Sequence, residues 1–500
     1  MRRRVILISI VGLFLVMAGL FPSMSRAESA IDRYMTGGHF NLELSDDSIT
    51  DTSKFEAELE LRLRYEGLSA FVRGSNDRPF AFQREPFELD KWGFNYELND
   101  DWQVTGGDYS LIFGRGTALN AVENRQVDRD AQLRGGMVKG DLGDTDLTAF
   151  RGTHRSEGVD YYLTGVNTTE GDPSDELWGG RADFDFKDLN LGLGWIDSDI
   201  TRFGTQESTI VTELDGSWRI DDFSVYYETA FFNRNELEGS TESADGRAQL
   251  AQLIYAEPGF SMEGSWVRYD KARFDYGTAP SLKRYDIDSP DAHPDDETGY
   301  RLDCRVSPES WDGNSLRVLY ADLNGIRNKN QDFGNYFIEW LSPQTEEWTG
   351  SLSYDHISGM LLYYGAVSGT DESIRGTIDG PFPLGGSFHF SARYRMLESK
   401  FENDDEVELG FDWHVSPEFT VGLIRETSTR PTEPAPPGIM GIPTESPGEW
   451  NSAFLRWAPD PMSQFELVLG SQRGGFQCAG GTCAQVPPFK GVRFTYYRNL

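Results

Sequence analysis

The stretch KFEAELELRLRYEG, residues 54–67, decides the fold class. Apolar and charged residues alternate along it without a break, whereas an amphipathic helix needs apolar residues spaced by three and four positions. Strict alternation predicts a strand whose two faces contact different media. The apolar residues are Phe55, Ala57, Leu59, Leu61, Leu63 and Tyr65, and the charged residues are Lys54, Glu56, Glu58, Glu60, Arg62, Arg64 and Glu66.

The same alternation recurs along the chain, for example in IVTELDGSWRI (210–220) and in the C-terminal GVRFTYYRNL (491–500). Two classes of connection separate these segments. The short ones are Asn99-Asp100-Asp101, Asp221-Asp222, Ser307-Pro308-Glu309, Ser342-Pro343-Gln344, Ser416-Pro417 and Pro459-Asp460-Pro461. The long polar ones are 155–175, 271–297, 427–448 and 474–488.

Alternating short turns and long loops predict an all-β fold, a transmembrane antiparallel β-barrel of the bacterial outer membrane. Hairpins laid end to end from residue 36 give about 24 strands, with a range of about 22–26. The range reflects residues 348–369, which are either one long strand kinked near Gly359 or two strands. A closed barrel satisfies every backbone group in hydrocarbon. A soluble solenoid or propeller would need a fixed repeat, and the sequence has none.

The N-terminus predicts a secretory signal peptide over residues 1–27, followed by a barrel over 28–500. Arg2, Arg3 and Arg4 precede an apolar run over 5–21, and Ser25-Arg26-Ala27 fits a cleavage site. An uncleaved anchor is the alternative, but the run is short for a spanning helix. We therefore expect export to the outer membrane of a Gram-negative bacterium, with cleavage near Ala27.

The chain is strongly acidic, with 46 basic and 81 acidic residues and a net charge of −35. Loss of four arginines with the signal peptide would lower this charge to −39. Such a charge argues against nucleic acid as a partner.

Tryptophans near the short turns predict an interfacial girdle in contact with outer-membrane lipids. They are Trp102, Trp218, Trp311, Trp340, Trp348, Trp413 and Trp457. The final strand alternates Val492, Phe494, Tyr496 and Leu500 with polar residues. It resembles the C-terminal signal that the barrel-assembly machinery recognises, although its last residue is Leu and Arg498 interrupts its apolar side.

Cys478 and Cys483 lie close together in FQCAGGTCAQ, and in an oxidising compartment we expect a disulfide between them. A metal-binding pair is the alternative, but no second Cys or His pair lies near it. Cys304 is expected to be an unpaired strand residue. No C-x-x-C-H motif is present for haem attachment, and we expect neither a cofactor nor a metal.

The segment after Trp102 breaks the strand rhythm and is the candidate functional site. Two glycines, Gly114 and Gly116, permit a sharp change of direction. Charges of both signs follow, and such charges at a constriction set the selectivity of a pore. We predict an inward-folded loop whose constriction residues are Arg115, Glu123, Arg125, Asp128, Arg129 and Asp130. An ordinary extracellular loop is the alternative.

This segment also carries a family resemblance. Gly107-Asp108-Tyr109, Phe113-Gly114-Arg115-Gly116, Leu119, Glu123 and Asp130-Ala131-x-Leu133 resemble the signature of a poorly characterised family of predicted outer-membrane β-barrels. The C-terminal C-x-x-x-x-C, proline and final strand resemble that family's ending. The resemblance implies the fold and the location, and it implies no substrate or reaction.

Enzyme chemistry has little support in the sequence. Asp355, His356 and Ser358 superficially resemble a barrel lipase site, but neighbouring residues on a strand point to opposite faces. The acidic stretch 285–297 matches no defined calcium loop, and a solvated loop is the simpler interpretation.

We therefore predict a non-enzymatic, porin-like channel. A barrel of about 24 strands would be wide, so inward loops or a partner should occupy its lumen. Two alternatives remain: a sheath around a periplasmic or lumenal partner protein such as an electron-transfer cytochrome, and a surface adhesin with ligand-binding loops.

Overall fold

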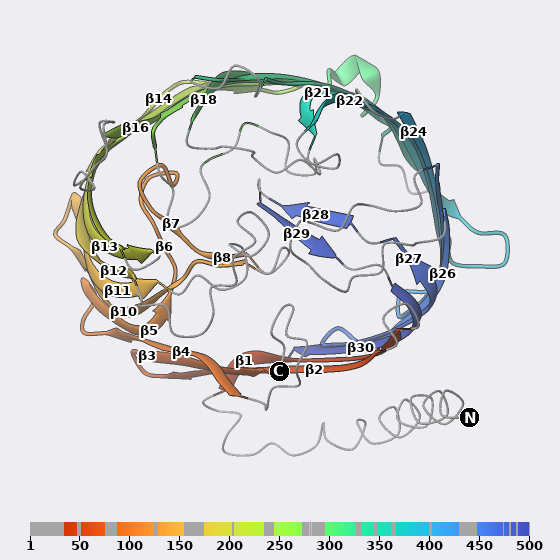
Figure 1. The fold of residues 1–500 in the computed structure, drawn as a ribbon, viewed down its shortest axis with the longest axis horizontal. Coiled ribbons are helices and arrows are strands. Elements are labelled where there is room, and N and C mark those ends of the chain that lie inside the picture. The colour runs from red at the N-terminus through yellow and green to blue at the C-terminus, as the bar shows by residue number, and fades with distance from the viewer. Residues whose placement is uncertain are drawn as a thin grey trace.

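The computed structural model describes most of the chain after residue 34. The described residues are 35–47, 52–75, 88–124, 129–154, 175–202, 205–234, 245–272, 280, 282, 296–326, 332–343, 348–361, 367–399, 403–429, 448–473, 475–479, 482–486 and 489–499. Within them, 24 strands form one antiparallel sheet that closes into a ring (Figure 1). The predicted fold class and the predicted number of strands are confirmed.

The ring follows chain order, and each strand pairs with the one before it and the one after it. The ring strands are β1 (Met35–Asp47), β2 (Thr52–Tyr65), β3 (Leu68–Ser75), β4 (Glu88–Glu97), β5 (Trp102–Tyr109), β10 (Leu133–Asp141), β11 (Thr145–His154), β12 (Asp175–Phe186), β13 (Leu189–Arg202), β14 (Thr205–Ile220), β15 (Phe223–Arg234), β16 (Gly246–Glu257), β17 (Phe260–Asp270), β18 (Asp296–Val306), β19 (Ser315–Gly325), β20 (Phe333–Leu341), β21 (Thr349–Leu361), β22 (Val367–Pro381), β23 (Ser387–Ser399), β24 (Asn403–Ser416), β25 (Phe419–Ser428), β26 (Glu449–Asp460), β27 (Ser463–Gln472) and β30 (Phe489–Asn499).

The remaining elements lie outside the ring sheet. They are β6 (Leu111–Ile112), β7 (Asn120–Ala121), β8 (Glu123–Asn124), β9 (Arg129–Asp130), the short 3₁₀ helix η3 (Glu309–Trp311), β28 (Gly475–Ala479) and β29 (Thr482–Val486). The part of the chain described here contains no helix long and apolar enough to cross a membrane.

The first and last strands close the ring. β30 pairs with β27 on one side and with β1 on the other, where Leu42 lies opposite Tyr496 and Leu44 opposite Phe494. The aromatic ring of Phe465 on β27 lies 4.5 Å from that of Tyr496. Because both edges of the sheet are paired, no strand edge is left to hydrogen-bond in hydrocarbon.

The six predicted short connections each join consecutive strands at the same end of the ring. At the opposite end the connections vary in length. Only two residues, 203–204, separate β13 from β14 there, whereas 20 residues, 155–174, separate β11 from β12. Residues 348–369 contribute to two strands, because β21 ends at Leu361 and β22 begins at Val367.

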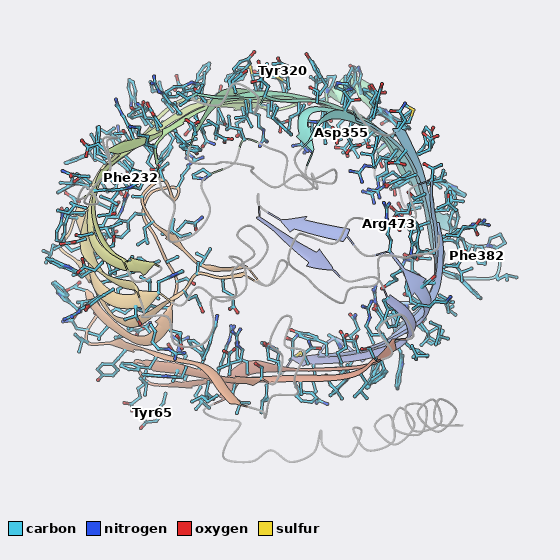
Figure 2. The ribbon with its side chains drawn as sticks, in the orientation of Figure 1. Tyr65, Phe232, Tyr320, Asp355, Phe382 and Arg473 are labelled. Atoms are coloured by element: carbon cyan, nitrogen blue, oxygen red, sulfur yellow. The ribbon has the colours of Figure 1, made fainter. Side chains whose placement is uncertain are left out.

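The alternation of apolar and charged residues in the sequence places apolar side chains on the outer face of the wall and charged side chains on the inner face. On β14, Leu214 and Trp218 are 50% and 51% exposed, whereas the intervening Asp215 is 9% exposed. Figure 2 shows Tyr65 outside the ring and Asp355 and Arg473 inside it. The outward apolar face and the inward polar face predicted from residues 54–67 are therefore confirmed.

Aromatic side chains form two outward groups on the wall. The predicted one lies beside the short turns and includes Trp218, Trp340 and Trp348, all more than two-fifths exposed. A second group, absent from the sequence predictions, lies further along the strands. It includes Trp178 with Trp195 and the row Tyr300, Tyr320 and Tyr336. Two aromatic belts are what a membrane-spanning barrel presents at its two lipid–water interfaces.

The charged inner face does not continue around the whole ring. From β10 to β21 many inward positions away from the short turns are apolar and buried, and they join one hydrophobic cluster. Residues from these strands include Phe150, Leu177, Ile196, Val211, Phe232, Leu250, Val267, Leu323 and Phe333. This apolar arc of the inner wall positions the candidate site.

Candidate functional site

Between β5 and β10 the structure describes residues 110–124 and 129–132, and several of them contact the inner wall. Figure 1 shows β6, β7 and β8 within the circle of wall strands. Four side chains of the segment, those of Leu111, Phe113, Leu119 and Ala121, are at most 5% exposed and belong to the hydrophobic cluster of the wall. Segment 110–132 is therefore packed against the apolar arc.

Phe113 is the centre of this packing. Its side chain is fully buried, and its ring meets that of Phe150 on β11 edge to face, with centroids 5.7 Å apart. The guanidinium of Arg181 on β12 lies over the same ring, 5.7 Å from its centroid. Both contacts are favourable beyond the burial of apolar area.

A tight turn follows Phe113 and explains both glycines. The N–H of Gly116 donates to the carbonyl of Phe113 at 2.8 Å, and the N–H of Phe113 donates to the carbonyl of Leu119 at 3.0 Å. Gly114 and Gly116 have φ of 53° and 98°, which glycine adopts without steric cost. A Cβ at Gly114 would lie 2.5 Å from a carboxylate oxygen of Glu213 and 2.7 Å from the carboxyl group of Glu228.

Glu228 on β15 binds this turn directly. Its carboxylate accepts hydrogen bonds from the N–H of Arg115 at 2.8 Å and from both the N–H and the hydroxyl of Thr117, at 2.9 and 2.6 Å. The hydroxyl of Tyr226 donates to it at 2.7 Å. Glu228 is fully buried. Because a buried carboxylate must be hydrogen-bonded, turn and wall stabilise each other.

A second set of buried charges lies beside Glu228. Arg181 contacts Asp183, Glu213 and Asp215, with N–O distances of 2.6, 3.2 and 2.7 Å. Glu213 and Asp215 come from β14, so the arginine joins two strands through its planar fork of donors. Sequence analysis did not single out Arg181, Glu213 or Glu228, because each is one charge among many in an alternating strand.

The end of segment 110–132 binds β3 and β4, which precede β5 in the ring. Glu123 contacts Arg73 on β3 at 2.6 Å and Lys91 on β4 at 3.1 Å. The ammonium of Lys91 also donates to Gln132 at 2.8 Å. Both cationic side chains are about 95% buried. The segment is thus fixed to β15 near its start and to β3 and β4 near its end, and it links parts of the wall that are eight strands apart.

The structure describes the side chains of only two of the six predicted constriction residues. Arg115 lies over the ring of Tyr226, 4.4 Å from its centroid, and Glu123 binds the wall. Arg125 and Asp128 lie outside the described residues. Arg129 and Asp130 are described only by their backbone, in β9.

The backbone register pairs β8 with β9. Glu123 is the cross-strand partner of Asp130, and Asn124 is the partner of Arg129. These residues therefore belong to the two strands of one small hairpin. The constriction itself stays a prediction.

Two residues of the sequence signature, Asp108 and Tyr109, hydrogen-bond β5 to neighbouring wall strands. Asp108 accepts two hydrogen bonds from Arg134, at 2.7 and 2.9 Å, and one from the N–H of Trp92 at 2.9 Å. Tyr109 points to the other face and donates to the carbonyl of Arg151 at 3.2 Å. The signature residues are thus mainly positions that hold segment 110–132 and its neighbouring strands together.

A second element, the hairpin of β28 and β29, lies within the outline of the ring in the view of Figure 1. Just before it, Arg473 contacts Glu406 and Glu426 on the wall, the latter at 3.2 Å, and lies over the ring of Trp450. Residues 478 and 483 are direct cross-strand partners in the hairpin. Antiparallel partners have Cα atoms about 4.5–5.5 Å apart, which suits a disulfide. The disulfide itself stays a prediction, and Cys304 is a free thiol.

The remaining candidate groups do not converge. Asp355 faces the lumen and accepts a hydrogen bond from Asn335 at 2.7 Å. His356 faces outward, where it pairs with Glu372 at 3.0 Å. Asp355 and His356 therefore lie on opposite faces of β21, as predicted. In the described part of the chain, no three His, Cys, Asp or Glu residues are placed to hold a metal ion. Most of the acidic stretch 285–297 lies outside that part.

Comparisons with known proteins agree with this architecture. A model of a family of unknown function (DUF6029) matches residues 53–286, a little under half of the chain. The matched range contains segment 110–132 and the strands that hold its two ends. No curated protein matches the sequence.

Solved structures match over nearly the whole chain. A P pilus tip assembly intermediate of E. coli, PapC-PapD-PapK-PapG, matches with a TM-score of 0.52 and 8% identity, over 95% of this chain and 62% of that one. The chain has the fold of an outer-membrane β-barrel. The siderophore receptor PirA of Pseudomonas aeruginosa matches with a TM-score of 0.47 and 9% identity, over 93% of this chain and 80% of that chain. The outer membrane protein opdK of the same organism matches with 0.35 and 9%, over 94% and 99%.

Proposed function

We propose that this protein is an outer-membrane channel whose lumen is narrowed by segment 110–132. The observation that carries the proposal is the attachment of this segment to the inner wall at both ends, through Glu228 at one end and through Arg73 and Lys91 at the other. A ring of 24 strands exceeds the barrels of 16–18 strands that already enclose an aqueous channel. A fixed inward segment reduces such a lumen to a selective passage.

The nature of the attachment supports a permanent constriction. Each end combines buried apolar contacts with hydrogen bonds to charged groups, which are worth about 1.5–3 kcal/mol each. Breaking either end would remove hydrogen bonds from a buried carboxylate or a buried cation, and that cost is larger than the loss of an exposed ion pair.

The test is ion conductance of the refolded protein in a planar bilayer. We expect discrete, ohmic steps from the wild-type chain and larger steps after deletion of residues 117–130, because the deletion removes the constriction. Equal step sizes for the two proteins would contradict a constricting role. Closed wild-type and deletion barrels would favour a sheath around a partner protein or a surface adhesin, neither of which requires an open lumen. The proposal assigns no catalytic reaction to the chain.

A further inference from the structure

The turn between β22 and β23 differs from the other connections at the short-turn end. Its sequence, PFPLGGS over residues 381–387, contains no charged residue. Other turns at this end carry acidic or basic residues, as in Asp221-Asp222 and Lys187-Asp188. Leu384 at its tip is 77% exposed, the highest value among the large hydrophobic side chains of the described residues.

The turn folds outward onto the lipid-facing belt. The ring of Phe382 lies 6.1 Å from that of Phe388, 5.9 Å from Phe411 and 5.2 Å from Trp413. These three residues face outward, because they alternate along β23 and β24 with residues of the inner face such as Asp412. Figure 2 shows Phe382 outside the ring. The turn therefore continues the aromatic belt beyond the wall.

Hydrogen bonds fix the turn in this orientation. The N–H of Phe382 donates to the carbonyl of Gly386 at 3.0 Å, and the N–H of Gly385 donates to the carbonyl of Phe382 at 2.9 Å. The indole N–H of Trp413 donates to the carbonyl of Gly385 at 2.9 Å. Gly385 and Gly386 have φ of 97° and 75°, and a Cβ at Gly386 would overlap the carbonyl oxygen of His414. The exposed Leu384 is thus held by an ordered scaffold.

We infer that this turn is a lipid-binding surface that inserts Leu384 into the bilayer leaflet at the short-turn end of the barrel. The ligand class is a glycerophospholipid, contacted at the boundary between its head group and its acyl chains. Three features favour lipid over a protein partner: continuity with the aromatic belt, the uncharged sequence, and the outward direction of the turn. Aromatic and apolar side chains prefer this boundary. The inference requires the barrel to lie in a membrane, but it does not depend on channel activity.

Spin labelling in bilayers of phosphatidylethanolamine and phosphatidylglycerol tests the inference. The label is attached in a Cys304→Ser background at Leu384→Cys, at Phe390→Cys as the lipid-facing control, and at Asp222→Cys as the water-facing control. Oxygen concentrates in lipid, and a neutral nickel chelate concentrates in water. We expect the ratio of oxygen to nickel collision rates at position 384 to match that at 390 and to exceed that at 222 several-fold.

Either of two results would overturn the inference. A collision ratio at 384 equal to that at 222 would place the tip in water, and low access to both reagents would place it against protein. A second measurement avoids cysteine substitutions altogether. Benzoylphenylalanine at position 384 of the otherwise unchanged chain should form phospholipid adducts on irradiation, as it should at 390. Adducts at 390 but none at 384 would also reject the inference. Heat-modifiability on gels verifies that each variant is folded, so loss of the barrel and loss of lipid contact are distinguishable.

Discussion

At the scale of single residues, Glu228 has the most direct control over segment 110–132. Its carboxylate is the acceptor for three donors of the turn and for Tyr226, and it has no access to solvent. No short-range pattern in the sequence marks it, because the turn residues that it binds, Arg115 and Thr117, are more than 100 positions away. The geometry makes one inward glutamate of an alternating strand the attachment point of segment 110–132.

Glu228→Ala should release the start of the segment. The substitution leaves the N–H groups of Arg115 and Thr117 without their acceptor, at a cost of about 1–3 kcal/mol for each unsatisfied group. We expect larger single-channel conductance or frequent transitions to a larger state. Glu263→Ala is the matched control, since Glu263 is also an inward glutamate but has a hydrogen bond only from the nearby Ser265 hydroxyl among its described contacts. Identical single-channel recordings for both variants would contradict the role of Glu228.

Gly114→Ala tests the fit of the turn against the wall. A Cβ at this position would require both left-handed backbone strain and displacement of the Glu213 and Glu228 carboxylates. Gly143→Ala is the control, because Gly143 also has positive φ but no atom lies within 4 Å of its Cβ position. We expect limited proteolysis to cleave segment 110–132 in the Gly114 variant only. The control should lose about 1 kcal/mol of stability from backbone strain alone. Equal protection in both variants would show that the turn tolerates the added atom.

At the scale of elements, the interior of the ring holds two structures that the wall positions. The segment from β6 to β9 is attached through Glu228 and Glu123, and the β28–β29 hairpin follows Arg473, which binds wall carboxylates. Each element leaves the ring between two consecutive wall strands and returns to it. Such inserts narrow a barrel without adding a separate domain.

Arg125 and Arg129 should influence charge selectivity. Replacing both Arg125 and Arg129 with Ala removes two positive charges, so the remaining acids should raise the preference for cations. The measurement is the reversal potential across a salt gradient. Lys187→Ala combined with Arg219→Ala removes the same charge at the short-turn end and serves as the control. A reversal potential that shifts equally in both double variants would indicate a general surface-charge effect, which about 1 M salt would screen within about 3 Å.

The β28–β29 hairpin should be closed by a disulfide between Cys478 and Cys483, because its register makes them direct partners. The chain has three cysteines, and one of them, Cys304, is free. Denatured protein treated with a maleimide mass tag should therefore gain one tag without reduction and three after reduction. Three tags in the unreduced sample would disprove the bridge. Cys304→Ser should lose only the tag that needs no reduction.

At the scale of the whole molecule, the two aromatic belts and the closed ring define a membrane-spanning barrel. Fractionation of a Gram-negative host should find the mature chain in the outer membrane, with its electrophoretic mobility dependent on heating. The physical reason is the complete inter-strand hydrogen bonding of a closed sheet, which resists detergent until the ring unfolds. Recovery of the chain in the soluble periplasmic fraction would contradict this location. A periplasmic protein of the same host serves as the fractionation control.

The sequence by itself determined the wall of this barrel. The alternation in residues 54–67 and 210–220 indicates a strand whose two faces contact different media. Each short turn indicates that the chain reverses direction once. The number of strands and their orientation therefore follow from local patterns. The pair Phe231-Phe232 departs from this alternation, because two neighbouring residues are both apolar. It could have indicated that part of the inner face is apolar. Phe231 is 46% exposed on the outside, whereas Phe232 is 3% exposed in the lumenal cluster.

Only the tertiary structure decided what lies against the inner wall. Segment 110–132 has no periodicity, and its glycines predicted a change of direction without saying which strands it would meet. The partners of Arg115 and Thr117 come from β15, and those of Glu123 come from β3 and β4. Closure of the ring brings these strands to one lumen. The carboxylates of Glu228 and Glu123 therefore contact donors from distant parts of the chain. Such long-range contacts leave no pattern in neighbouring residues.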